Sequence, residues 1–95
     1  MKGYVIGEIE VTNQAVYDEY RGQVLATIQK YGGRFLVRGG AHEVKEGGWK
    51  PSRVIVLEFP SMEQARAWYH SQEYAPALAL RLKAASAKLI LVEGA

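Results

Sequence analysis

The residues best suited to chemistry in this sequence are two carboxylates and two guanidinium groups in apolar segments: Glu8, Glu58, Arg38 and Arg53. A carboxylate enclosed by apolar strands has a raised pKa and can take up or deliver a proton. An arginine can hold a substrate carboxylate or a developing enolate. Glu58 and Glu8 are therefore candidate acid–base residues, and Arg38 and Arg53 are candidate ligand-binding residues. The alternative is a structural Glu–Arg pair, because ion pairs in folded proteins also perturb pKa values.

The chain contains two histidines and no cysteine. His42 follows Gly39-Gly40, where a backbone without side chains permits close approach of a ligand, so His42 is a further candidate base. A surface or turn histidine is the alternative. Neither His42 nor His70 has a carboxylate at the spacing of a helical zinc motif, and thiolate ligands are absent. We therefore expect no metal and no cofactor.

Aromatic residues are frequent in the second half of the chain. Trp68 continues the apolar stripe of a predicted helix, which indicates a core position. Tyr69 and Tyr74 are candidate ligand-binding residues, either as the walls of a pocket for a flat or apolar molecule or as phenol donors. Trp49 lies in a glycine-flanked loop and is a candidate interface residue or pocket lid.

The elements that must position these residues follow from the spacing of apolar residues. Alternating or continuous apolar runs predict strands, and apolar residues at helical spacing predict two main helices and a short third one. The predicted strands span residues 3–11, 34–38, 53–59 and 88–93, with pairing of the second strand resuming at 42–45; the main helices follow Asn13 and Ser61, and the short one spans 77–84. Gly32-Gly33 ends the first helix, and Gly47-Gly48 supplies a hairpin turn.

The order of these elements is β-α-β-β-α-β, which predicts an α+β, ferredoxin-like fold with a four-stranded antiparallel sheet and two main helices on one face. The strands are apolar on both parities, as Ile6 beside Val5 and Val56 beside Leu57 illustrate. The uncovered face would expose a large apolar patch. A second copy of the sheet is the simplest cover, so we expect a homodimer through the open sheet faces.

Composition limits the classes of function. The 95-residue chain has 48% hydrophobic and 23% charged residues, the usage of one ordinary globular domain over residues 1–95. Its 12 basic and 10 acidic residues are interspersed, with a net charge of +2, so we expect no nucleic-acid partner. Glu8 interrupts the apolar start and no run reaches membrane-spanning length, so we expect no export signal and no membrane partner. A cytoplasmic protein with a small apolar or carboxylate-bearing ligand is the expectation.

A pattern of aromatic, glycine and charged residues extends over nearly the whole chain. It comprises Tyr31-Gly32-Gly33-Arg34, Arg38-Gly39-Gly40, Glu43, Trp49 with Pro51 and Arg53, Glu58-Phe59-Pro60-Ser61, Trp68-Tyr69-x-Ser71-x-Glu73-Tyr74, Arg81 and Val92-Glu93-Gly94. This pattern resembles the bacterial domain-of-unknown-function family 1330. The resemblance implies membership of the dimeric α/β-barrel superfamily, in which two ferredoxin-like sheets pack face to face, but no established activity. Relatives in that superfamily include cofactor-free monooxygenases, lactone isomerases, haem-degrading enzymes and stress-associated proteins.

Three hypotheses of function follow. The first is a dimeric protein that binds a small molecule. In one version of this hypothesis the protein is a cofactor-independent enzyme of proton-transfer or oxygenation type, with Glu58 or Glu8 as the acid–base group. The second is a non-catalytic assembly or stress-response module, whose charged residues only stabilise the fold and the dimer. The third is haem binding through His70, which rests on analogy with the haem-degrading relatives.

Overall fold

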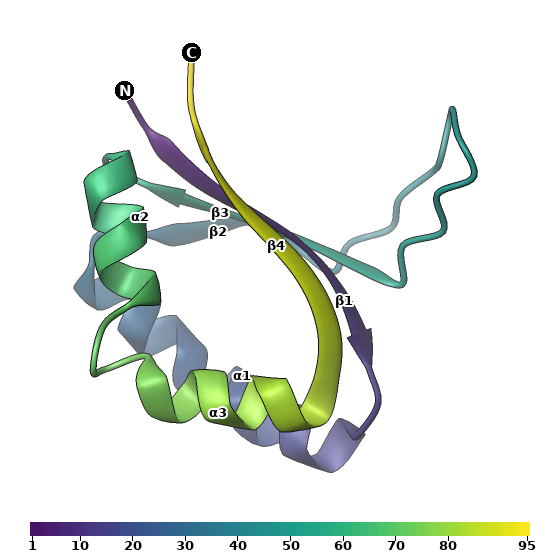
Figure 1. Cartoon of the computed structure of the whole chain (residues 1–95), viewed down its shortest axis with the longest axis horizontal. Coiled ribbons are helices and arrows are strands. Elements are labelled where there is room, and N and C mark those ends of the chain that lie inside the picture. The colour runs from purple at the N-terminus through teal and green to yellow at the C-terminus, as the bar shows by residue number, and fades with distance from the viewer.

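The computed structural model describes residues 1–95 and shows an antiparallel sheet that carries three helices on one face and curves around them (Figure 1). The elements are β1 (Gly3–Val11), α1 (Gln14–Lys30), β2 (Arg34–Arg38), β3 (Arg53–Phe59), α2 (Met62–Tyr69), α3 (Ala75–Ala84) and β4 (Ala85–Glu93). The four strands are arranged in the order β2-β3-β1-β4. This is the ferredoxin-like α+β fold that the sequence predicts.

The first helix has the predicted caps at both ends. The side chain of Asn13 accepts a hydrogen bond from the backbone N–H of Val16 at 3.2 Å, so one of the free N–H groups of the first turn has a partner. At the other end, Gly32 has a φ of +78° and the N–H of Gly33 donates to the carbonyl of Ile28 at 2.9 Å. A left-handed residue after the last turn is a common helix end and favours glycine.

The segment between β2 and β3 is a long loop, and the prediction that pairing resumes at 42–45 is wrong. Pairing of β2 ends at Arg38, opposite Ile55, because Gly39 has a φ of +70° and turns the chain away from the sheet. The loop then projects on the side of the sheet away from the helices, where no strand lies beside it (Figure 1). Gly47 has the expected positive φ, +80°, but within this loop rather than in a tight hairpin.

The second half of the chain follows the prediction with shifted boundaries. Ser61 caps α2 by accepting from the N–H of Gln64 at 3.1 Å, whereas the Gln64 side chain donates to the carbonyl of Tyr31 at 3.4 Å. Only half of the predicted capping box therefore forms. The short helix begins at Ala75, with Pro76 in its first turn, and the chain passes from it directly into β4.

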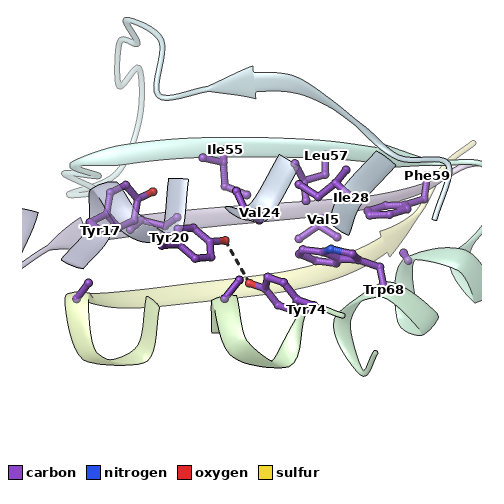
Figure 2. Close-up of a cluster of buried hydrophobic side chains, with 14 residues drawn as sticks. Val5, Tyr17, Tyr20, Val24, Ile28, Ile55, Leu57, Phe59, Trp68 and Tyr74 are labelled. Atoms are coloured by element: carbon purple, nitrogen blue, oxygen red, sulfur yellow. Dashed lines mark hydrogen bonds between the residues drawn. The ribbon is translucent and has the colours of Figure 1, made fainter. Parts of the chain in front are cut away.

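The hydrophobic core lies between the sheet and the helices. Trp68, at the centre of it, packs against Tyr74 with ring centroids 4.2 Å apart and against Phe59 at 5.5 Å, both in tilted arrangements (Figure 2). Aromatic pairs at such distances stabilise a core beyond the area they bury. Trp68 is thus a core residue, as its helical spacing predicts.

The opposite face of the sheet is uncovered and partly apolar. The register places Tyr4 beside Glu58 and Ile6 between Val56 and Ile90 on this face. Ile90 is 59% exposed and Val92 39% exposed. The strands are therefore apolar on both faces, as predicted. None of the helices is both long and apolar enough to cross a membrane.

Candidate functional site

A narrow cavity lies inside the fold, between the helix-covered face of the sheet and the helices α1 and α3. Its volume is about 20 Å³, room for about one water molecule. Most of its lining is apolar, but it also contains four arginines and three tyrosines: Arg21, Arg38, Arg53, Arg81, Tyr17, Tyr20 and Tyr74. No aspartate, glutamate or histidine lines it. The cavity is therefore positively charged and carries no acidic counter-group.

Arg53 enters the cavity from the start of β3. Its guanidinium carbon lies 5.8 Å from the centre of the Tyr17 ring, within range of a cation–π contact. Its Nε is buried and has no hydrogen-bond partner. Gly39 makes this position available, because a side chain there would collide with the Arg53 guanidinium. The space beside Gly39, where the sequence predicts a ligand, is thus filled by the Arg53 side chain.

Arg38 enters from the end of β2, beside Arg53. Its guanidinium carbon lies 4.3 Å from the centre of the Phe35 ring, and Nη2 donates to the backbone carbonyl of Arg21 at 3.4 Å. Burial, together with the positive charges of Arg21 and Arg53, lowers the pKa of the Arg38 guanidinium. An arginine remains charged despite such a shift. The three guanidinium groups therefore repel one another at this end of the cavity.

Arg81 reaches the cavity from α3 and is only 4% exposed. Its Nε donates to the hydroxyl of Tyr74 at 3.4 Å, and that hydroxyl lies 3.2 Å from the hydroxyl of Tyr20. Figure 2 shows the two rings converging, Tyr20 from α1 and Tyr74 from the residue before α3. Both phenols are buried, and burial raises the pKa of Tyr20. Tyr20 is therefore a neutral hydrogen-bonding group at physiological pH.

The four charged residues singled out from the sequence do not come together. Arg38 and Arg53 face the helices, whereas Glu58 and Glu8 lie on the open face of the sheet. Arg53 and Glu58 are an odd number of residues apart in one strand, and successive side chains of a strand point to opposite faces. The predicted anion-binding residues are thus in the cavity, and the predicted acid–base carboxylates are outside it.

Glu58 has basic and phenolic partners on the open face. Its carboxylate accepts from Arg34 Nε at 3.1 Å and from the Tyr4 hydroxyl at 3.3 Å, with Lys2 Nζ at 3.9 Å. Burial raises the pKa of Glu58, but the bond from Arg34 and the charges of Arg34 and Lys2 outweigh it, so the pKa is lowered overall. The prediction of a raised pKa for this carboxylate is wrong, because Arg34 lies directly opposite Glu58 on the neighbouring strand.

The remaining outer residues lie near the long loop. Trp49 donates a hydrogen bond from Nε1 to the Glu8 carboxylate at 3.0 Å, and this bond connects the loop to β1 on the open face. The ring of His42 makes a hydrogen bond through Nε2 to the carbonyl of Pro51 at 3.1 Å. His42 and Trp49 both line a wide, open hollow under the loop and not the interior cavity.

The two predicted pocket tyrosines differ in position. Tyr74 lines the cavity, whereas Tyr69 packs beside it, with ring centroids 6.0 Å apart. His70, the candidate haem ligand, is exposed after the last residue of α2 and stands edge-on to the Tyr69 ring. No group of three or more histidine, aspartate or glutamate side chains lies together as a metal site would require.

Sequence reasoning missed Arg81 as a site residue, although a signal was available. Arg81 stands in the apolar helix segment Ala75–Ala84, at helical spacing from the small residues Ala77 and Ala84. All three are buried on one side of α3. An arginine in a stripe of small buried residues has a side chain that must run inward, so its placement could have been predicted. Tyr20 was not singled out either, because its helical spacing does not reveal the partner of its hydroxyl.

Comparison with solved structures supports the fold. The chain is similar to a protein of unknown function from Rhodopseudomonas palustris, with a TM-score of 0.78, 14% identity and coverage of 99% of this chain and 82% of that one. SnoaB, a cofactor-independent oxygenase from Streptomyces nogalater, gives a TM-score of 0.68 at 10% identity, covering 99% and 93%. A dimeric ferredoxin-like protein of unknown function from Jannaschia sp. CCS1 gives 0.66 at 11% identity, covering 99% and 100%. At these identities the likeness shows the fold alone.

Comparison of the sequence itself gives the family. No curated protein matches the sequence significantly. The profile of a family described as a domain of unknown function, DUF1330, matches residues 2–95, in agreement with the resemblance seen in the sequence. The chain therefore belongs to the DUF1330 family.

Proposed function

We propose that this protein binds a small organic anion, with an apolar or aromatic body, in the cavity between the sheet and the helices. The observation that carries the proposal is the charge of the cavity: four arginines line it and no carboxylate does. Burial of a guanidinium without a counter-charge lowers the stability of the folded protein, because the charge is taken from water and not compensated. A ligand carboxylate would supply that counter-charge.

Arg38 and Arg53 are the groups that would hold the ligand carboxylate. They lie at the same end of the cavity, and Arg53 Nε is a buried donor without an acceptor. Charge-assisted bonds from arginine to a carboxylate are short, strong and often bidentate. The apolar residues further in, among them Val24 and Leu57, would contact the ligand body.

Ligand entry requires side chains to move. A cavity of about 20 Å³ admits one water molecule but not an aromatic ring. Arg21 is exposed and Arg38 is half-buried, so these two side chains can swing outward without disturbing the core. Rearrangement of side chains on binding is common even where the backbone stays fixed.

Calorimetric titration with benzoate, and with neutral benzamide as its isosteric control, tests the proposal. We expect benzoate to bind more tightly than benzamide, and Arg53→Gln to weaken benzoate binding by about 10-fold or more, the loss of one charged hydrogen bond. Arg66→Gln is the matched control, because Arg66 is exposed on α2 and does not line the cavity. Equal binding of benzoate and benzamide, or no binding of either, would contradict the proposal.

The open sheet face supports a second part of the proposal, a homodimer through these faces. Exposed apolar side chains of β1, β2 and β4 gather there, and the long loop projects on the same side (Figure 1). Apolar patches of this kind in soluble proteins commonly mark an interface. Assembly of the structurally similar Jannaschia protein as a dimer is consistent with it.

Catalysis by Glu58, Glu8 or His42 remains a prediction and would require a different location. Since none of the three lines the cavity, a reacting ligand would have to lie on the open face or under the loop. SnoaB, a cofactor-independent oxygenase with the same fold, is the model for such an enzyme. The ion-paired state of Glu58 favours the non-catalytic module instead. If Glu58 is catalytic, Glu58→Gln should abolish any turnover that the wild-type protein shows. If the protein is a non-catalytic module, the variant should differ mainly in stability or dimerisation.

A further inference from the structure

The hydroxyl groups of Tyr20 and Tyr74 and the Nε of Arg81 form a cluster with more donors than acceptors. Arg81 Nε can only donate, and it donates to the Tyr74 oxygen at 3.4 Å. The two hydroxyls share one hydrogen bond of 3.2 Å, in which either can be the donor. If Tyr74 donates, the Tyr20 hydrogen has no protein acceptor, and if Tyr20 donates, the Tyr74 hydrogen has none. One hydroxyl hydrogen is therefore unpaired in both arrangements.

The cluster is also buried and positively charged. Arg81 is 4% exposed, Tyr20 is 8% exposed and Tyr74 is fully buried. All three line the cavity, whose lining contains no carboxylate. A cation that donates into a chain of hydroxyls polarises the chain and strengthens its last donor. Such a site favours an oxygen that carries negative charge or a strong carbonyl dipole.

We infer that Tyr20, Tyr74 and Arg81 form a second subsite of the cavity, which binds a carbonyl, enolate or phenolate oxygen of the ligand. The inference rests on the proposed function, because it assumes a ligand whose carboxylate is held by Arg38 and Arg53. It specifies the ligand class further: an aromatic or unsaturated acid with a second oxygen at a distance from its carboxylate. The apolar residues between the two polar ends would contact the carbon framework.

The Tyr17 ring lies between Arg53 of the first subsite and Tyr20 of the second. Arg53 lies over the Tyr17 ring, the Tyr17 and Tyr20 ring centroids are 5.5 Å apart, and those of Tyr20 and Tyr74 are 6.5 Å apart. The rings of Tyr17, Tyr20 and Tyr74 thus form a row, with planes at 42° between Tyr17 and Tyr20 and at 64° between Tyr20 and Tyr74 (Figure 2). A ligand that contacts this row of rings would present one oxygen group at each end.

The test compares ligands that differ only in the second oxygen. The probes are 3- and 4-acetylbenzoate, each against the isopropenylbenzoate of the same shape, which has a methylene group in place of the carbonyl oxygen. We expect the better acetylbenzoate to bind about 2- to 10-fold more tightly than its isopropenyl counterpart, as one hydrogen bond between neutral groups predicts. The ¹³C resonance of a labelled acetyl carbonyl should move downfield on binding, because a strong donor polarises that bond.

The double variant Tyr20→Phe/Tyr74→Phe should lose this preference while still binding benzoate, and Tyr31→Phe is the control because its hydroxyl contacts Glu73 on the surface. If the acetyl and isopropenyl compounds bind equally to the wild-type protein, the second subsite is wrong while the Arg38/Arg53 site stands. If none of the carboxylates binds, both proposals are wrong. The comparison in wild-type protein decides the matter even if the double variant does not fold.

Discussion

Arg53 and Glu58 belong to the same strand but lie on opposite faces of the sheet, Arg53 in the interior cavity and Glu58 on the open face. This relationship divides the charged residues into two groups. The arginines of the cavity have no carboxylate among them, whereas Glu58 is neutralised by Arg34 and Lys2. The residues proposed to bind an anion and the carboxylates predicted to do acid–base chemistry therefore lie on different sides of one sheet.

Glu58→Gln should leave benzoate binding unchanged and lower thermal stability modestly. The substitution removes a carboxylate that accepts from Arg34 and Tyr4, but it touches nothing in the cavity. Because the folded pKa of Glu58 is below its ordinary value, its stabilising effect is present at neutral pH and disappears as the pH falls through that folded pKa. Calorimetric titration and melting curves at pH 7 measure both effects. A large loss of benzoate affinity would show that Glu58 belongs to the site after all.

Glu73 should make stability pH-dependent in acid. Hydrogen bonds from the Tyr31 hydroxyl and from Lys30 lower the pKa of Glu73 from 4.5 to about 2. The stabilising effect is therefore complete above pH 4.5 and is lost between 4.5 and about 2 as the carboxylate is protonated. The difference in Tm between wild type and Glu73→Gln should shrink over this range. Glu19→Gln, an exposed change on α1, is the control, and a difference in Tm that is constant down to pH 2 would contradict the prediction.

Ile90→Asp should convert a homodimer into a monomer. Ile90 is 59% exposed on the open face, in the edge strand β4 opposite Ile6 of β1, where a dimer through these faces would bury it. A buried charge without a partner in such an interface costs several kcal/mol. Leu82→Asp is the matched control, since Leu82 is 67% exposed but lies on α3, on the other side of the molecule. Light scattering after size exclusion gives the mass; a wild-type monomer, or a dimer that survives Ile90→Asp, would rule out this interface.

Two glycine-to-alanine changes should have opposite effects on stability. A Cβ at Gly3, in β1, would lie 2.6 Å from the carbonyl oxygen of Ser61 and 2.8 Å from Met62 Cα, both backbone atoms. Relief of such a clash typically costs about 1–3 kcal/mol. Gly22 is exposed on α1 with nothing near its Cβ position, so Gly22→Ala should stabilise the protein by about 0.5–1 kcal/mol. Urea unfolding of both variants measures the two changes, and a neutral Gly3→Ala would show that the chain at Ser61 can shift.

Much of the fold could be predicted because its signals are local. Asn13, Ser61 and the glycines after Tyr31 determine helix ends through contacts with neighbours in the chain. Apolar alternation identified the strands and the two-sided character of the sheet. The boundary errors, such as the early start of β4, arise where the chain passes from helix to strand without a turn residue. The prediction of a strand at 42–45 is wrong because a strand needs a second strand beside it, and no local sequence pattern shows whether one is there.

The candidate site was harder to predict for a related reason. Arg38 and Arg53 were chosen for their charge in apolar strands, and the structure places both in the cavity. The separation of Arg53 from Glu58 follows from strand parity and was available in the sequence. That of Arg38 depends on the pairing of β2 with β3 and on the irregularity between Phe35 and Val37. The contact of Tyr20 with Tyr74 joins residues 54 positions apart, so only the packing of α1 against the start of α3 brings them together.

The most direct test of anion binding in the cavity is a crystal structure of the protein with benzoate at saturating concentration. The proposal predicts electron density between the sheet and α1, with the carboxylate against Arg38 and Arg53 and the side chains of Arg21 and Arg38 displaced outward. Benzoate bound on the open face near Glu58, or under the loop near His42 and Trp49, with the cavity unchanged, would contradict it.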